Sequence, residues 1–90
     1  MPYINKNLRL KYDEYLDEIT DHKNGIPSKG ELEYCIFKLM KIYMTDKKYR
    51  YSVLHDCVYA AMHCADEFRR RYLDKREDEA IKENGDINGF

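Results

Sequence analysis

Residues 47 to 51, KKYRY, combine the residue types that could hold a nucleotide. They supply positive charge and flat aromatic rings: Lys47, Lys48, Tyr49, Arg50 and Tyr51. Cations attract phosphate, and a tyrosine ring offers a face on which a base can stack. The segment also leads into a predicted helix, whose first amides favour an anion. Two interpretations stay open: a nucleotide site, or tyrosines that pack against the start of the helix.

A second pattern, Asp56, His63 and Glu67, places a histidine and two carboxylates on one outer helix face. Spacings of seven and four residues return to the same side of a helix. Such a trio could serve a metal-dependent hydrolase, although a solvated helix face is the commoner reading. No cysteine–histidine spacing matches a zinc site, and no catalytic motif is present. We therefore predict no metal, no cofactor and no enzyme activity.

A third set, His55, Tyr59, Met62 and Asp66, recurs at spacings of four, three and four residues on the same predicted helix. This set should lie beside the apolar core face of that helix. One neighbouring helix cannot pack against both faces at once. Tyrosine, methionine and arginine suit protein interfaces, and Arg69 stands at the edge of the core face. We predict that these five residues form an interface with another protein.

The arginine triplet Arg69, Arg70 and Arg71 does not indicate general nucleic-acid binding. Adjacent helical residues point about 100° apart, so the three cannot form one patch. The chain has 16 Lys and Arg against 17 Asp and Glu, a net charge of -1, whereas nucleic-acid-binding domains are usually basic. Acid-before-base pairs four residues apart, Asp66 with Arg70 and Glu67 with Arg71, predict a helix stabilised by surface charge.

Three amphipathic helices must position these residues. Apolar side chains recur every three or four positions over residues 8–19, 32–43 and 54–72. The sequence SKGE at residues 28–31 has the capping-box spacing, and Ser52 is the expected cap of the third helix. We predict an all-α fold, a three-helix antiparallel bundle with a long third helix. Residues 1–84 form a single helical domain and residues 85–90 a flexible tail.

The lengths of the helices predict a homo-oligomer, a dimer or a multiple of it. The third helix should be about 45 Å long and the first about 21 Å, so two short helices cannot cover the long one and its second stripe. Three cysteines on apolar faces, Cys35, Cys57 and Cys64, are typical of a reducing cytosol. No segment matches a signal peptide or a membrane span. The expected location is cytoplasmic, with no membrane partner.

Four pieces of the chain carry a resemblance: MPYI, GELEY, CADEFRRR and EDEAIKENGD. They resemble a family of small uncharacterised phage and bacterial proteins with no known activity; YLDKRED departs from its pattern. The resemblance implies an all-helical accessory protein of a phage or mobile element in the host cytoplasm. The expected function is non-catalytic binding of a host protein. Sequestration of a nucleotide signal by the oligomer is the alternative, and a metal-dependent hydrolase is the second alternative.

Overall fold

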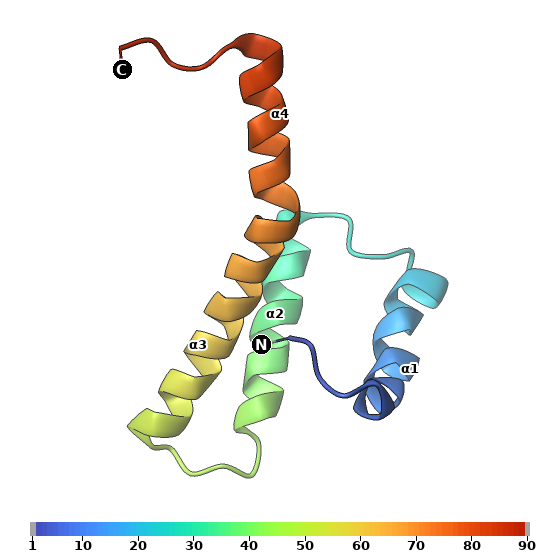
Figure 1. Cartoon of the computed structure of the whole chain (residues 1–90). Helices are drawn as coiled ribbons and strands as arrows, with labels where there is room; N and C mark the ends of the chain where they lie inside the picture. The colour runs from blue at the N-terminus through green and yellow to red at the C-terminus, as the bar shows by residue number, and fades with distance from the viewer. Residues whose placement is uncertain (1, 90) are drawn as a thin grey trace.

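Helices make up most of the chain (Figure 1). The computed structural model describes residues 2–89, without the side chains of residues 22 and 23. Its elements are α1 (Lys6–Lys23), α2 (Lys29–Met44), α3 (Tyr51–Phe68), the π-helix η1 (Arg69–Leu73) and α4 (Asp74–Asn84). No strand occurs within residues 2–89. The all-α prediction is confirmed, and α3, η1 and α4 follow one another directly as the predicted long third helix.

Helices α2 and α3 pack side by side and run antiparallel (Figure 1). Cys57 of α3 lies at this contact with only 7% of its surface exposed, and no other described residue is as buried. Its thiol donates to the backbone carbonyl of Met40 on α2, with 3.6 Å between sulfur and oxygen. Cys57 and Ala61 are small, which lets the two backbones approach closely. We call this contact the α2–α3 seam.

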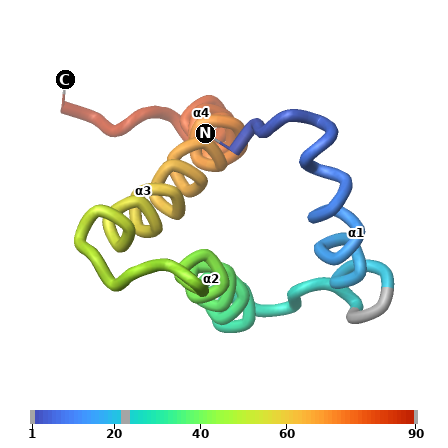
Figure 2. Tube along the Cα trace, turned by 90° about the horizontal axis from the view of Figure 1, so that it is seen from below, coloured from blue at the N-terminus to red at the C-terminus, as the bar shows by residue number. Residues whose placement is uncertain are grey.

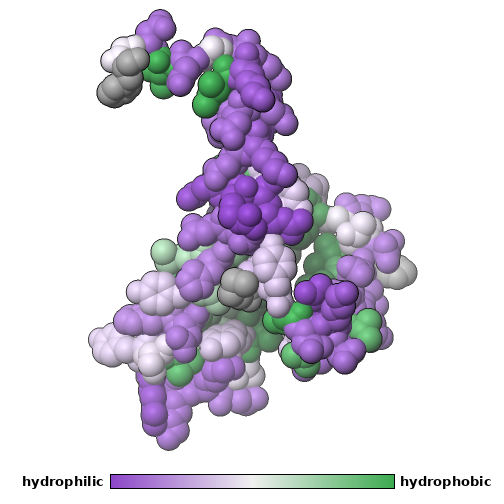
Figure 3. All heavy atoms as spheres, viewed as in Figure 1, coloured by the Kyte–Doolittle hydropathy of each residue, from purple (hydrophilic) through white to green (hydrophobic). Residues whose placement is uncertain are grey.

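Helix α1 stands apart from the α2–α3 pair (Figures 1 and 2). Throughout the described residues its Cα atoms stay more than 8 Å from those of α2, α3 and α4. Apolar side chains gather along the space between α1 and the pair, whereas α4 is largely hydrophilic (Figure 3). Of the three predicted helices, only the second and third are packed together.

The chain is consequently far more open than its size requires. Its Cα radius of gyration is 17.4 Å, against about 12 Å for a compact domain of this length. Its accessible surface is 8723 Å², against about 5,600 Å² for a compact protein of the same mass. Apolar side chains account for much of the difference, because most of them remain exposed.

Local signals at the helix ends explain where the elements stop. The Ser28 hydroxyl accepts from the Glu31 amide at 3.2 Å and donates to the Glu31 carboxylate, which confirms the predicted cap. After α1, Asn24 adopts the left-handed conformation with φ 62°. Gly85, with φ 83°, ends α4 as predicted.

The predicted cap at Ser52 is wrong. Arg50 has an extended backbone, with φ -115° and ψ 150°, and stands at the N-cap position without a side-chain hydrogen bond. Its carbonyl accepts the amide of Leu54 at 3.0 Å. Helix α3 therefore begins at Tyr51, and Ser52 lies inside the first turn.

The two serines give a matched test of this assignment. We expect Ser28→Ala to lower the free energy of unfolding by about 1 kcal/mol, because a first-turn amide of α2 loses its acceptor. Ser52→Ala should change it by less than about 0.5 kcal/mol, as for most surface substitutions. Urea unfolding followed by circular dichroism measures both values. Equal losses for the two variants would contradict the cap assignment.

Candidate functional site

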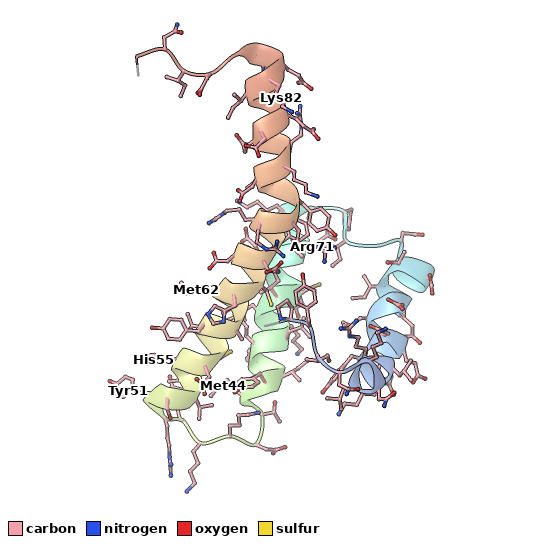
Figure 4. The ribbon with its side chains drawn as sticks, in the orientation of Figure 1. Met44, Tyr51, His55, Met62, Arg71 and Lys82 are labelled. Atoms are coloured by element: carbon pink, nitrogen blue, oxygen red, sulfur yellow. The ribbon has the colours of Figure 1, made fainter. Side chains whose placement is uncertain are left out.

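The predicted interface residues do share one side of α3. Figure 4 shows His55 and Met62 on the side of α3 turned away from α2, with Tyr51 at its start. At 100° per residue, all members of the set fall within about 80° of one another. Tyr51, which was not among the five predicted interface residues, falls on the same side, and we call the six together the outer α3 face: Tyr51, His55, Tyr59, Met62, Asp66 and Arg69.

The position of this face differs from the prediction in one respect. It was expected beside the packed side of α3, yet it lies nearly opposite. The reason is that the seam is centred on Cys57 and not on Val58, which remains 47% exposed. No part of α2 therefore reaches the outer α3 face.

Three rings order the first half of the outer α3 face. The centroids of Tyr51 and His55 lie 6.0 Å apart, and those of His55 and Tyr59 lie 6.1 Å apart. Such tilted and edge-on contacts are favourable between aromatic rings. Tyr59 and Met62 still expose about half of their surface, 52% and 50%. The exposed surface available to a partner therefore belongs in part to side chains whose orientation is already restricted by these ring contacts.

The second half of the face is charged. The Arg69 guanidinium lies 3.7 Å from the Asp66 carboxylate, and both side chains are mostly exposed. An ion pair this open contributes little to stability, so both groups stay available to a partner. The predicted pairs four residues apart, Asp66–Arg70 and Glu67–Arg71, are wrong: Asp66 pairs with Arg69, three residues on.

Residues 47–50 of KKYRY form an open turn between α2 and α3, and Tyr51 is the first residue of α3. Tyr49 is 88% exposed, so the interpretation in which it packs against the start of the helix is wrong. Tyr51 is 83% exposed, and its ring lies against that of His55 in the first turn of α3. Lys47 turns back onto α2, where its ammonium donates to the Tyr43 carbonyl and lies 4.0 Å from the centroid of the Tyr43 ring. Nucleotide binding here stays a prediction.

The trio Asp56, His63 and Glu67 is not brought together as a ligand set. Within residues 2–89, no three histidine, cysteine, aspartate or glutamate side chains are grouped closely enough to hold a metal ion. The Glu67 carboxylate is instead taken by hydrogen bonds from Tyr3 and Arg70. The hydrolase alternative therefore has no preformed site in this part of the chain.

Sequence reasoning missed a polar cluster that ties the start of the chain to the end of α3. The Tyr3 hydroxyl donates to Glu67 Oε1 at 3.1 Å and accepts from Arg71 Nη1 at 3.2 Å. Arg70 Nε donates to the same Glu67 oxygen at 3.0 Å. We call these four residues the N-terminal clasp. The Tyr3 hydroxyl stands between Glu67 and Arg71, which is why that predicted pair is bridged and not direct.

No periodicity could have revealed a contact between residues more than sixty positions apart. The only available signal was indirect: both sides of the contact lie in pieces of the chain that carry the family resemblance. Tyr3 lies in MPYI, and Glu67, Arg70 and Arg71 lie in CADEFRRR. Two shallow hollows of about 370 and 270 Å³ flank Pro2 at the clasp, and neither includes any residue of KKYRY. Together they are lined by Pro2, Tyr3, His63, Cys64, Asp66, Glu67, Phe68, Arg70, Arg71 and Tyr72.

Hydrogen bonding keeps the clasp charged. The Arg70 guanidinium lowers the pKa of the Glu67 carboxyl, and the Tyr3 hydroxyl and Arg71 act in the same direction. In return, Glu67 raises the pKa of Arg70, and Tyr3 raises that of Arg71. Each shift favours the ionised form, as expected for groups whose charged form is stabilised by a hydrogen bond or an opposite charge.

These features define a small all-α protein with one packed helix pair, a side of the long helix left open and an anchored N-terminal segment. The chain belongs to the family described as Domain of unknown function (DUF6899), which matches residues 1–87. This agrees with the resemblance to an uncharacterised family. No curated protein and no solved structure matches the chain significantly. Across the described residues, no helix is both long and apolar enough to span a membrane.

The clasp should respond to acid in one direction. A lowered folded-state pKa means that the stabilisation from Glu67 is present above its ordinary pKa of 4.5 and is lost as pH falls through the lower folded value. We expect an NMR titration of the Glu67 carboxyl carbon to give a midpoint below 4.5. Arg70→Gln should raise this midpoint more than Tyr3→Phe, because the Arg70 hydrogen bond is the largest cause. A midpoint unaffected by Arg70→Gln would contradict the assignment.

The open KKYRY turn allows a stability test. We expect Tyr49→Ala to change the free energy of unfolding by less than about 0.5 kcal/mol, since the side chain covers almost nothing. Tyr43→Ala should cost more, because Tyr43 is only 40% exposed and lies beneath Lys47. Thermal melts compare the two variants. A larger loss at Tyr49 would show that its ring is packed in solution.

Proposed function

We propose that this protein is a non-catalytic binding protein that docks onto another protein through the outer α3 face. One observation carries the proposal: Tyr51, His55 and Met62 lie on one side of α3 that α2 does not reach (Figure 4), and the helical spacing places the exposed Tyr59 and Arg69 on the same side. Tyrosine, methionine and arginine are enriched at protein interfaces. The Tyr51–His55–Tyr59 ring series reduces the entropy that these side chains lose on binding.

The charged groups of the clasp suit binding better than acid–base chemistry. A general acid or base works best when its pKa lies near the working pH. At the clasp the shifts run the other way, because Glu67 is held ionised and Arg70 and Arg71 are held protonated. These groups are suited to anchoring a segment or pairing with a partner's charges.

The resemblance to phage and bacterial proteins suggests where to look for the partner. In that setting the protein acts by occupying a host protein, and the charged end of the face at Asp66 and Arg69 contributes orientation. Electrostatic complementarity of this kind gives specificity and faster association more than affinity.

Affinity capture from a bacterial host lysate tests this function. The bait should carry its tag at the C-terminal end, because Tyr3 is bound in the clasp. We expect mass spectrometry to identify one enriched host protein that the double variant Tyr59→Ala, Met62→Ala fails to retain. Purified, that protein should bind the double variant at least about 30-fold more weakly, as for an interface hot spot worth about 2 kcal/mol.

Tyr34→Ala is the matched control, since Tyr34 is a 70% exposed tyrosine on α2 outside the outer α3 face. It should retain the partner at wild-type affinity. The small-molecule fraction of the same capture tests the nucleotide alternative. Recovery of a nucleotide with no protein partner would overturn the docking proposal, as would a partner held equally well by the double variant.

A further inference from the structure

Helix α2 is apolar around much more of its circumference than one neighbour can cover. At 100° per residue, its apolar positions from Ile42 round to Phe37 span about 220°, whereas a stripe of about 100° suffices for a helix packed on one side. Helix α3 covers the edge that includes Met40 and Met44. The opposite edge stays open, with Leu39 51% and Ile42 57% exposed.

Helix α1 presents a second uncovered face. Five of its apolar residues fall within about 100° of one another, and they are Leu8, Tyr12, Tyr15, Leu16 and Ile19. Both ends of α1 are tethered near the pair: Tyr3 is bound in the clasp, and residues 24–28 lead directly into α2. Even so, its backbone stays more than 8 Å from α2 and α3 across the described residues.

The area left open matches what an oligomer buries. The accessible surface of 8723 Å² exceeds that of a compact chain of this mass by about 3,100 Å². A stable interface of standard size buries about 800 Å² per partner. The charged helix α4 accounts for part of the excess surface. Even one third of the excess, however, is larger than the roughly 800 Å² that each partner buries in a standard interface.

We propose that a second copy of this chain covers the apolar face of α1 and the open edge of α2. One chain offers both faces side by side, so two copies related by a two-fold axis can cover each other with the same surface. The outer α3 face is not used and remains free for a different partner. The inference is thus independent of the proposed docking function.

Light scattering after gel filtration, at low micromolar concentration, tests the inference. We expect twice the chain mass of 10.9 kDa, or an even multiple of it. Leu16→Arg should reduce the mass to that of one chain, because it places a charge in the covered face of α1. Leu39→Arg should do the same from α2. A fall to single-chain mass with the helix content of the wild type, measured by circular dichroism, supports the interface.

Leu10→Arg is the control, with the same residue change on the same helix. Leu10 lies at least about 160° from the middle of the α1 face and is 72% exposed. The Leu10→Arg variant should therefore have the same mass in solution as the wild type. Two outcomes overturn the inference. A wild-type mass of 10.9 kDa would mean that α1 closes on its own chain or stays open. An oligomer that Leu16→Arg and Leu39→Arg leave intact would place the interface elsewhere.

Discussion

The contact of Cys57 with α2 determines the direction of the other side chains of α3. Residues on a helix turn by a set angle, so once Cys57 faces the Met40 carbonyl, His55 and Met62 must point away. A cysteine suits this position because it is small and apolar and is only a weak hydrogen-bond donor. The Met40 carbonyl lies inside α2 and does not depend on the thiol as a donor. The α2–α3 seam is narrow, so more of the surface of α3 stays exposed than is buried against α2.

The clasp determines the remaining arrangement. It joins the first residues of the chain to the end of α3, which closes the path from the N-terminal segment through α1 and α2 back to α3 (Figure 2). Its hydrogen bonds are exposed, and exposed polar contacts are weak individually. Their effect is geometric, because Tyr3 gives α1 a second attachment besides residues 24–28. Both ends of α1 are thereby held near the α2–α3 pair, although in the described residues its Cα atoms lie more than 8 Å from those of α2 and α3.

The features that sequence predicted well are those that depend on near neighbours in the chain. Ser28 and Glu31 are three residues apart, so the start of α2 could be read directly from the sequence. The end of α4 at Asn84 coincides with the predicted end of the helical domain and is equally local. The outer α3 face was found for the same reason, since helical spacing groups its members wherever the helix lies. Its orientation was missed because that depends on which edge α2 covers, and the choice between Cys57 and Val58 is made by packing. The clasp was missed because Tyr3 and Glu67 meet only through the fold.

The π-helix η1 has a consequence for the long helix as a whole. The Asp74 amide bonds the Arg69 carbonyl five residues back, so this turn holds one residue more than an α-helical turn. One extra residue changes the phase of everything that follows by about 100°. The exposed side of α3 therefore does not continue along α4, and the axis also changes direction between the two helices (Figures 1 and 2), as is common at a π-helical turn. The two parts of the long helix present their surfaces in different directions, and removing a single arginine from the triplet would restore the α-helical phase between them.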